Sequence, residues 1–321
     1  VLGHSADGKE VYWYQFKVPV RQPDKVVNGI QDFRSIRFMR MFLKGWSQPV
    51  VLRFATLDFV RGEWRKYTQS LETPGEVLGG DPDQTTFDVA AVNIEENGNR
   101  VPINYVLPPG ITQQTNIASA NLAALNEQSL QLVTCGLHDG DARAAFRNVS
   151  FDIRSYKKLQ MFIHAESSDP EHPIKYGDAT VFIRLGNDYE DNYYEYEVPA
   201  TPSPYSNNDP YSVWPEANNM IVEFAKLNDA KLQRNQSGFA VNQRYVVMDG
   251  DRRITVKGNP NLSQMTTIMI GIRNPKKDGA EANIWANDDG SSKCVEVWVD
   301  ELRLTDFDQR GGGAAIARVN T

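Results

Sequence analysis

The chain has 321 residues, of which 40% are hydrophobic and 23% charged, and its 41 acidic and 34 basic side chains give a net charge of −7. This length allows one large domain or two ordinary ones, and the acidic balance argues against a general attraction to nucleic acid or anionic lipid. No apolar run approaches the roughly 18 residues of a transmembrane helix. The chain opens on VLGHSADG without Met, so we expect it to be part of a longer protein.

Strand-like alternation dominates the chain. In the stretch YYEYEV, for example, aromatic or apolar residues alternate with Glu195 and Glu197. Such period-two stretches, rich in aromatic and β-branched residues, predict strands with two distinct faces. We expect strands at 11–18, 179–185, 193–198 and 295–302.

Helical periodicity is scarce. The two candidates are NLAALNEQSL at 121–130 and the stretch 215–233, each long enough for one short helix. Turn signals such as NGN and DGD separate the predicted strands. The pattern predicts an all-β, antiparallel, jelly-roll-like β-sandwich of the galactose-binding-like type with few short helices.

The chain also repeats itself. DFRSIRFMRMFL at 32–43 matches DIRSYKKLQMFI at 152–163, WYQFKVP matches YYEYEVP, and the stretch 50–64 has the character of 293–307. The sandwich is therefore expected twice, with an incomplete first copy. The predicted domains are the C-terminal part of a first unit at 1–72, an extended connector at 73–119, a second unit at 120–308 and a Gly-rich tail at 309–321.

Residues with catalytic or ligand-binding chemistry do not form a known motif. The four histidines lack metal-site spacing, so hydrogen-bonded or exposed roles are expected for them. The paired loop carboxylates favour hairpin turns, with a structural calcium ion or glycoside hydrolysis as alternatives. A buried core position is the commoner role for a tryptophan, and a sugar platform is the alternative. These residues are His4, His138, His164 and His172; Asp139, Asp141, Asp249, Asp251, Asp288 and Asp289; and Trp13, Trp46, Trp64, Trp214, Trp285 and Trp298.

Long strings throughout the chain resemble one family. NGIQDFRSIRFMRMFLKGW, VVLRFATLDFVRGEWRKY, VNIEENGNRVPINYVLPPGI, FIRLGNDYEDNYYEYEVP and CVEVWVDELRLTDFDQRGGGAA are similar to the SprA family, also called Sov. That family is the giant outer-membrane β-barrel translocon of the type IX secretion system, which is linked to gliding motility. The resemblance covers nearly the whole chain and brings no catalytic residues or cofactors with it.

The resemblance implies partners and a location. The partners would be the rest of the translocon barrel, a PorV-type outer-membrane protein, a periplasmic plug protein and cargo proteins with a C-terminal secretion signal. Because this chain lacks the long series of alternating strands of a barrel, we expect an extra-membrane cap or scaffold portion, exposed to the periplasm or the cell surface. The alternatives are a cell-surface carbohydrate-binding module and a glycoside hydrolase sandwich.

The two cysteines, Cys135 and Cys294, have no zinc-site spacing and could be two separate buried thiols or one disulfide. They lie near the start of the second unit and in its closing strand, and such strands of a jelly roll commonly share a sheet. The compartment implied by the family is oxidising. We therefore predict a structural disulfide between them.

Overall fold

The computed structural model describes residues 63–71, 85–113 and 126–308, except residues 152, 206, 207, 280 and 287. Earlier in the chain it describes residues 2–4, 10–12 and 39–54, with single positions up to residue 57. The chain divides into two compact units, Val1–Arg61 and Gly62–Thr321, and each is described by itself. The predicted Gly-rich tail at 309–321 lies outside the described residues.

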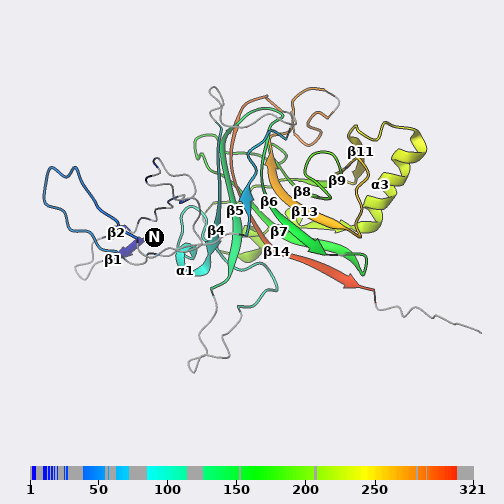
Figure 1. Ribbon diagram of the computed structural model, residues 1–321. Coiled ribbons are helices and arrows are strands. Elements are labelled where there is room, and N and C mark those ends of the chain that lie inside the picture. The colour runs from blue at the N-terminus through cyan, green and yellow to red at the C-terminus, as the bar shows by residue number, and fades with distance from the viewer. Residues whose placement is uncertain are drawn as a thin grey trace, which may run out of the picture. The chain divides into compact units, whose positions relative to one another are not determined.

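The described part of the second unit is built mostly of antiparallel strands, with few helices (Figure 1). The helices are α1 (Ile94–Asn97), α2 (Pro210–Val213), the short 3-10 helix η1 (Glu216–Asn218) and α3 (Phe224–Ser237). The strands are β3 (Arg65–Lys66), β4 (Thr86–Asn93), β5 (Gln128–Leu137), β6 (Ala142–Phe151), β7 (Tyr156–Ser167), β8 (Thr180–Gly186), β9 (Tyr193–Pro199), β10 (Met220–Glu223), β11 (Tyr245–Asp249), β12 (Arg252–Lys257), β13 (Met265–Arg273) and β14 (Lys293–Phe307).

Two sheets pack on one core. The five-stranded sheet has the order β10-β7-β14-β5-β4, and the seven-stranded sheet has the order β11-β12-β9-β8-β13-β6-β3. Alternate residues of each sheet point inward, as Met161 and Ile163 do on β7 and Val181 and Ile183 do on β8, and these four are fully buried in one cluster. The prediction of a mostly β, sandwich-like fold with antiparallel sheets and few helices is confirmed.

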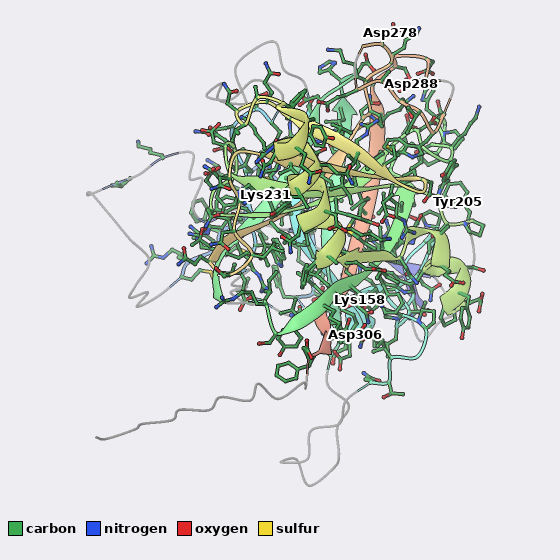
Figure 2. All side chains as sticks on the ribbon, turned by 90° about the vertical axis from the view of Figure 1, so that its right-hand side faces the viewer. Lys158, Tyr205, Lys231, Asp278, Asp288 and Asp306 are labelled. Atoms are coloured by element: carbon green, nitrogen blue, oxygen red, sulfur yellow. A yellow bond between two sulfur atoms is a disulfide. The ribbon has the colours of Figure 1, made fainter. Side chains whose placement is uncertain are left out.

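The predicted strands of the second unit are present. The stretches 179–185 and 193–198 correspond to β8 and β9, and 295–302 lies within β14. β7 and β14 stay paired beyond the end of the β5–β14 pairing, and there Lys158 and Asp306 form an ion pair at 3.2 Å (Figure 2).

The two helix predictions fared differently. Within 215–233, residues Met220–Glu223 form strand β10 and the helix α3 begins only at Phe224. It ends before Gly238, whose φ of +70° suits glycine at a helix C-terminus. The prediction for 121–130 is wrong at residues 128–130, which begin β5; residues 121–125 lie outside the described residues. Pairing with β4 and β14 outweighs the weak local helical pattern there.

Part of the stretch predicted as an extended connector belongs to the sandwich. β4 pairs with β5 along its whole length and places Phe87 in the main core. After it, Ile103 and Tyr105 are buried in a second cluster with Trp214 and Trp298. Residues 86–107 therefore contribute an edge strand and a cover for the five-stranded sheet.

The outer faces of both sheets are covered by segments from outside the sheets. Tyr67 packs with Phe182 and Met269 on the outer face of the seven-stranded sheet. β8 and β9 are buried along their whole length, on both faces. Side chains that would face water in a simple sandwich are enclosed here, and these include charged ones.

The first unit has little regular structure among its described residues. β1 (Leu2–His4) pairs with β2 (Glu10–Tyr12) in antiparallel fashion. Residues 39–54 form an exposed segment without strand pairing, and Gly45 within it has a φ of +85°. Of the predicted strand at 11–18, residues 11 and 12 belong to β2, whereas residues 14, 16 and 18 are exposed and outside any strand; residues 13, 15 and 17 lie outside the described residues.

Candidate functional site

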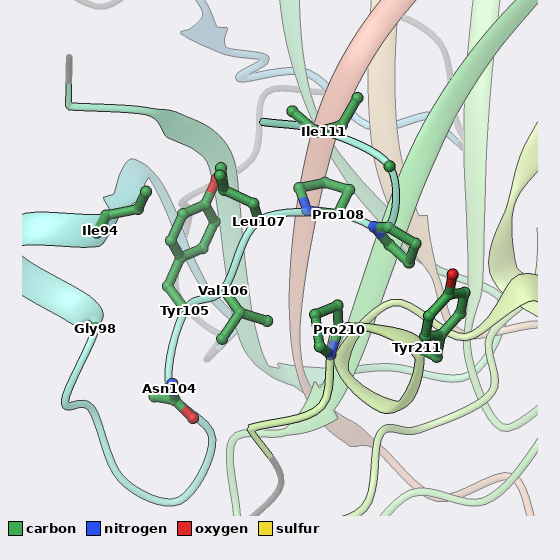
Figure 3. A pocket seen from close by; sticks show the side chains of 12 residues that line it. Ile94, Gly98, Asn104, Tyr105, Val106, Leu107, Pro108, Ile111, Pro210 and Tyr211 are labelled. Carbon is green, nitrogen blue, oxygen red and sulfur yellow. The ribbon is translucent and has the colours of Figure 1, made fainter. Parts of the chain in front are cut away.

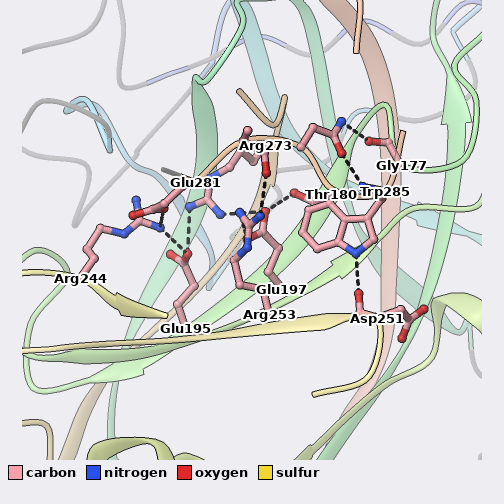
Figure 4. A network of polar contacts seen from close by, with 12 residues as sticks. Gly177, Thr180, Glu195, Glu197, Arg244, Asp251, Arg253, Arg273, Glu281 and Trp285 are labelled. Carbon is pink, nitrogen blue, oxygen red and sulfur yellow. Dashed lines mark hydrogen bonds and ion pairs between the residues drawn. The ribbon is translucent and has the colours of Figure 1, made fainter. Parts of the chain in front are cut away.

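The first group of enclosed charges lies on the outer face of the seven-stranded sheet and is centred on Glu195 (Figure 4). In β9, Glu195 points away from the core because its neighbours Tyr194 and Tyr196 point into it. The register places Arg184 of β8 directly opposite Glu195. Arg184 donates to Glu195 Oε2 through Nε at 3.0 Å and Nη2 at 2.6 Å.

Two more arginines reach the same carboxylate. Arg273 of β13 donates to Glu195 Oε1 at 2.9 Å, and Arg244 lies 3.3 Å from that oxygen. Glu195 is fully buried. Burial alone would raise the pKa of Glu195, but the charges of Arg273, Arg184 and Arg244 outweigh it and hold this pKa well below its ordinary value.

Glu197, two residues further along β9, extends the network. It accepts a hydrogen bond from Thr180 Oγ1 at 2.5 Å and pairs with Arg273 at 2.8 Å. Arg253 lies 3.6 Å from the other oxygen of Glu197 and stacks under Trp285, with 4.7 Å between the guanidinium carbon and the ring centre. Trp285 in turn donates to the carbonyl of Asp251. The network therefore ties β8, β9 and β13 to the loop that carries Trp285 (Figure 4).

A second group of enclosed charges lies on the outer face of the five-stranded sheet. Arg100 bridges Glu166 of β7 at 2.5 Å and Glu296 of β14 at 2.8 Å. Glu296 also accepts hydrogen bonds from the Trp298 indole at 2.7 Å and from Gln131 at 2.6 Å. Burial raises the pKa of Glu166, but the neighbouring His164 and the charge of Arg100 leave it below its ordinary value. The two carboxylates share one arginine and do not face each other across a cleft.

Among the predicted histidines whose side chains the structure describes, His164 is the one that is completely buried. Its ring stacks on Trp298 at 3.9 Å, and its Nδ1 lies 2.8 Å from the carbonyl of Val213 and 2.9 Å from Ser203 Oγ. Glu166 lies 3.8 Å from Nε2. The side chains of Ser203, His164 and Glu166 thus lie in a row, as in the catalytic triad of a serine hydrolase. However, the Ser203 hydroxyl donates its hydrogen bond to the carbonyl of Val213, and Ser203 is itself buried. The arrangement fixes the packing of Trp298.

One shallow groove is lined by apolar side chains (Figure 3). It has a volume of about 490 Å³ and runs between the stretch 104–111 and the start of α2, with Pro108, Leu107 and Tyr211 on its walls. Tyr211 is 71% exposed. Among the described residues, no acidic residue, histidine or cysteine lines this groove, and its titratable side chains are those of Tyr105 and Tyr211.

The predicted loop carboxylates take part in local turns and ion pairs. Asp141 pairs with Arg143, Asp249 pairs with Lys226 at 2.8 Å, and Asp289 pairs with Lys293 at 2.9 Å. Asp139 accepts from the backbone of Lys277, and Asp288 accepts from that of Gly290. Within the described ranges no three acidic, histidine or cysteine side chains converge as a metal ion requires.

The remaining predicted site residues are dispersed. His138 and His172 are exposed, as is Trp46, whereas Trp64 and Trp285 are half-buried. Trp214 and Trp298 are buried in the second cluster. The side chains of His4 and Trp13 lie outside the described residues. No row of exposed tryptophans is found among the side chains that the structure describes, and an exposed row is what a sugar platform needs.

The two cysteines meet on neighbouring strands. Cys135 of β5 and Cys294 of β14 lie side by side where the register shifts, with 3.9 Å between their Cα atoms. The sequence reasoning did not find the two networks. The sequence did contain a signal for the network on the seven-stranded sheet. Outward positions on predicted or central strands are occupied there by charged residues, namely Arg184, Glu195, Glu197 and Arg273.

Comparison with known proteins gives one result. A family model described as motility related/secretion protein matches residues 3–321. None of the curated proteins compared with the chain matches it. Within the described residues, no helix combines the length and apolar character needed to cross a membrane.

Proposed function

Because the chain belongs to the SprA_N family of motility related/secretion proteins, we propose that it is a non-enzymatic, extra-membrane cap or scaffold region of an outer-membrane translocon for type IX secretion. The family is one of secretion and motility proteins rather than of enzymes. Within this proposal the region faces the periplasm or the cell surface. Its partners are the translocon barrel, a PorV-type protein, a plug protein and passing cargo.

The observation that carries the proposal is the state of the buried acids. Glu195, Glu197, Glu166 and Glu296 are all buried, and each is paired with arginine. Catalytic carboxylates need access to substrate and a proton to exchange. These carboxylates instead fasten covering segments onto both outer faces of the sandwich, which is a structural role.

The strand order supports the finer fold proposal of a jelly roll. One sheet contains β5-β14-β7-β10 and the other β6-β13-β8-β9. Strands that alternate between two sheets of four in this way are the pattern of a double Greek key. β3, β4 and the β11–β12 hairpin are then additions at the edges. Such a rigid, fully covered block suits a domain that caps or braces a protein-conducting barrel.

The test is a deletion in the intact translocon. Removing residues 62–308 should abolish export of cargo or stop the translocon from assembling. Single changes at surface positions, such as the exposed His172→Ala or the half-buried Asp139→Asn, should leave export intact. Normal export by a deletion variant that is still inserted in the outer membrane would refute the scaffold role.

A carbohydrate-binding module is the second candidate, favoured by the exposed Tyr211 at the edge of the apolar groove. An aromatic ring there could stack on a sugar. The purified chain should then bind a cell-surface glycan, and Tyr211→Ala should remove that binding. If the chain binds no glycan in an array, the carbohydrate-binding candidate is rejected and the scaffold role is the remaining proposal.

A further inference from the structure

The exposed segment of the first unit is strongly apolar. Between residues 39 and 54, Met39, Met41, Leu43, Val50, Leu52 and Phe54 are each 45% to 64% exposed. Contiguous apolar side chains of this size rarely face water in a folded protein, and where they do they mark an interaction surface. The segment is therefore a candidate interaction surface.

Two stretches of this segment correspond to strands of the second unit. MRMFL at 39–43 aligns with LQMFI at 159–163 in β7, with Met and Phe identical. VVLRF at 50–54 aligns with VFIRL at 181–185 in β8, with Val and Arg identical. Neither alignment needs a gap. The match of 50–54 to 181–185 includes identical residues, whereas the stretches 50–64 and 293–307 are alike only in character.

The corresponding residues show what covers such strands. The side chains of the corresponding strands belong to one core and are at most 2% exposed: Met161 and Ile163 on β7, and Val181 and Ile183 on β8. β7 lies between β10 and β14, and β8 lies between β9 and β13. The counterparts of these residues in the first unit lack such flanking strands among the residues that the structure describes there.

We propose that residues 39–54 form a docking surface for an extended, acidic polypeptide that adds to the segment as antiparallel β-strand. In this mode the backbone hydrogen bonds provide affinity, and alternate side chains provide specificity. The apolar side chains of the incoming strand would lie beside Leu52 and Phe54, as those of β9 and β13 lie beside the counterparts of these residues on β8.

Charge identifies the partner as acidic. Residues 39–54 contain Arg40, Lys44 and Arg53 and no acidic residue, in a chain whose net charge is −7. Arg53 corresponds to Arg184, which lies directly opposite Glu195 of β9 and donates two hydrogen bonds to it. A strand beside residues 50–54 should therefore present a carboxylate to Arg53. A second copy of the segment would present like charge and is disfavoured.

The test uses the 321-residue chain and a fluorescent peptide with the sequence of residues 192–200, NYYEYEVPA, which carries two glutamates on one face. We expect binding in fluorescence anisotropy. Leu52→Asp should remove it, and Arg53→Glu should weaken it by about tenfold or more, because like charges would then face each other. A peptide with both glutamates replaced by lysine should regain affinity for the Arg53→Glu variant.

Val101→Asp is the matched control, because Val101 is an equally apolar exposed residue in the second unit and should not affect binding. Circular dichroism of each variant would show that the second unit stays folded. The proposal is overturned if the peptide does not bind, or if its affinity is the same for the wild-type chain and the Arg53→Glu variant. A dimer in light scattering that Leu52→Asp dissociates, without peptide binding, would replace it with self-association. The inference does not depend on the proposed secretion role.

Discussion

At Glu195 one buried carboxylate is paired with guanidinium groups from three arginines. Glu195→Gln would leave Arg184 and Arg273 enclosed with less compensation, and breaking a buried ion pair on one side is strongly destabilising. We expect the free energy of unfolding to fall by about 3 to 5 kcal/mol. Urea unfolding of the purified chain measures this change.

The matched control is Glu216→Gln, because Glu216 is exposed at the surface. It should change the free energy of unfolding by at most about 0.5 kcal/mol. Similar small effects at both positions would show that the network on the seven-stranded sheet contributes little to the stability of the fold.

The same carboxylate predicts a pH dependence. The pKa of Glu195 is depressed in the folded protein, since the charges of Arg273, Arg184 and Arg244 outweigh the effect of burial. A depressed pKa contributes stability that is fully present above the unfolded glutamate pKa of about 4.3 and is lost as the pH falls toward the folded value. The stability difference between the wild type and Glu195→Gln should therefore narrow below about pH 4.3. A constant difference from pH 7 to pH 3 in urea unfolding would contradict this.

At this scale the sequence identifies the alternation but not the burial. Glu195 and Glu197 occupy every second position of a predicted strand, which fixes the face on which they lie. Their enclosure depends on Arg244, Trp285 and other residues that arrive from distant loops. Local periodicity carries no information about such covering segments. The same holds for Glu166 and Glu296, whose shared partner Arg100 lies far away in sequence.

At the scale of elements, the pairing of β5 with β14 predicts a stable disulfide between Cys135 and Cys294. The bond would close a loop with a sequence separation of 159 residues. It should contribute about 4 kcal/mol, mainly by restricting the unfolded chain. Thiol titration of the unfolded, unreduced protein should find no reactive cysteine. Two reactive thiols would show that the bond does not form.

The variant Cys135→Ser measures how much the disulfide contributes to the free energy of unfolding. It should lower the free energy of unfolding by about the same amount, and Cys135→Ser with Cys294→Ser should cost little more, because one bond is lost in both cases. Adding reductant should bring the wild type to the level of the single variant. A reductant-independent difference would place the cost in side-chain packing.

Element types followed from sequence where both local pattern and tertiary pairing agreed. β8, β9 and β14 have strict alternation, and each is a strand. The stretch 121–130 shows why the rest did not follow, since residues 128–130 alternate weakly and take their structure from β4 and β14 on either side. The groove between the stretch 104–111 and α2 could not be predicted from local sequence patterns, because its two walls lie about a hundred residues apart in the sequence.

At the scale of the whole molecule, the domain boundary can be tested by truncation. The sequence placed the start of the sandwich at residue 120, whereas the compact unit begins at Gly62. β4 contributes Phe87 to the main core, and Tyr105 packs on Trp298 with 5.9 Å between the rings. These residues belong to the unit structurally, so a fragment without them should lack part of its core.

We therefore expect a fragment of residues 62–308 to unfold cooperatively, with a stability close to that of the full chain. A fragment of residues 120–308 should fail to fold. It loses Phe87, Val92, Ile103 and Tyr105 from the buried clusters, and each such loss costs about 2 to 5 kcal/mol. Their sum is of the same order as the roughly 5 to 15 kcal/mol that stabilises a whole domain. Exposure of Trp214 and Trp298 in the shorter fragment should shift its fluorescence to longer wavelength. A cooperative transition and blue-shifted emission from residues 120–308 would instead make residue 120 the true boundary and reduce β4 to a dispensable edge strand.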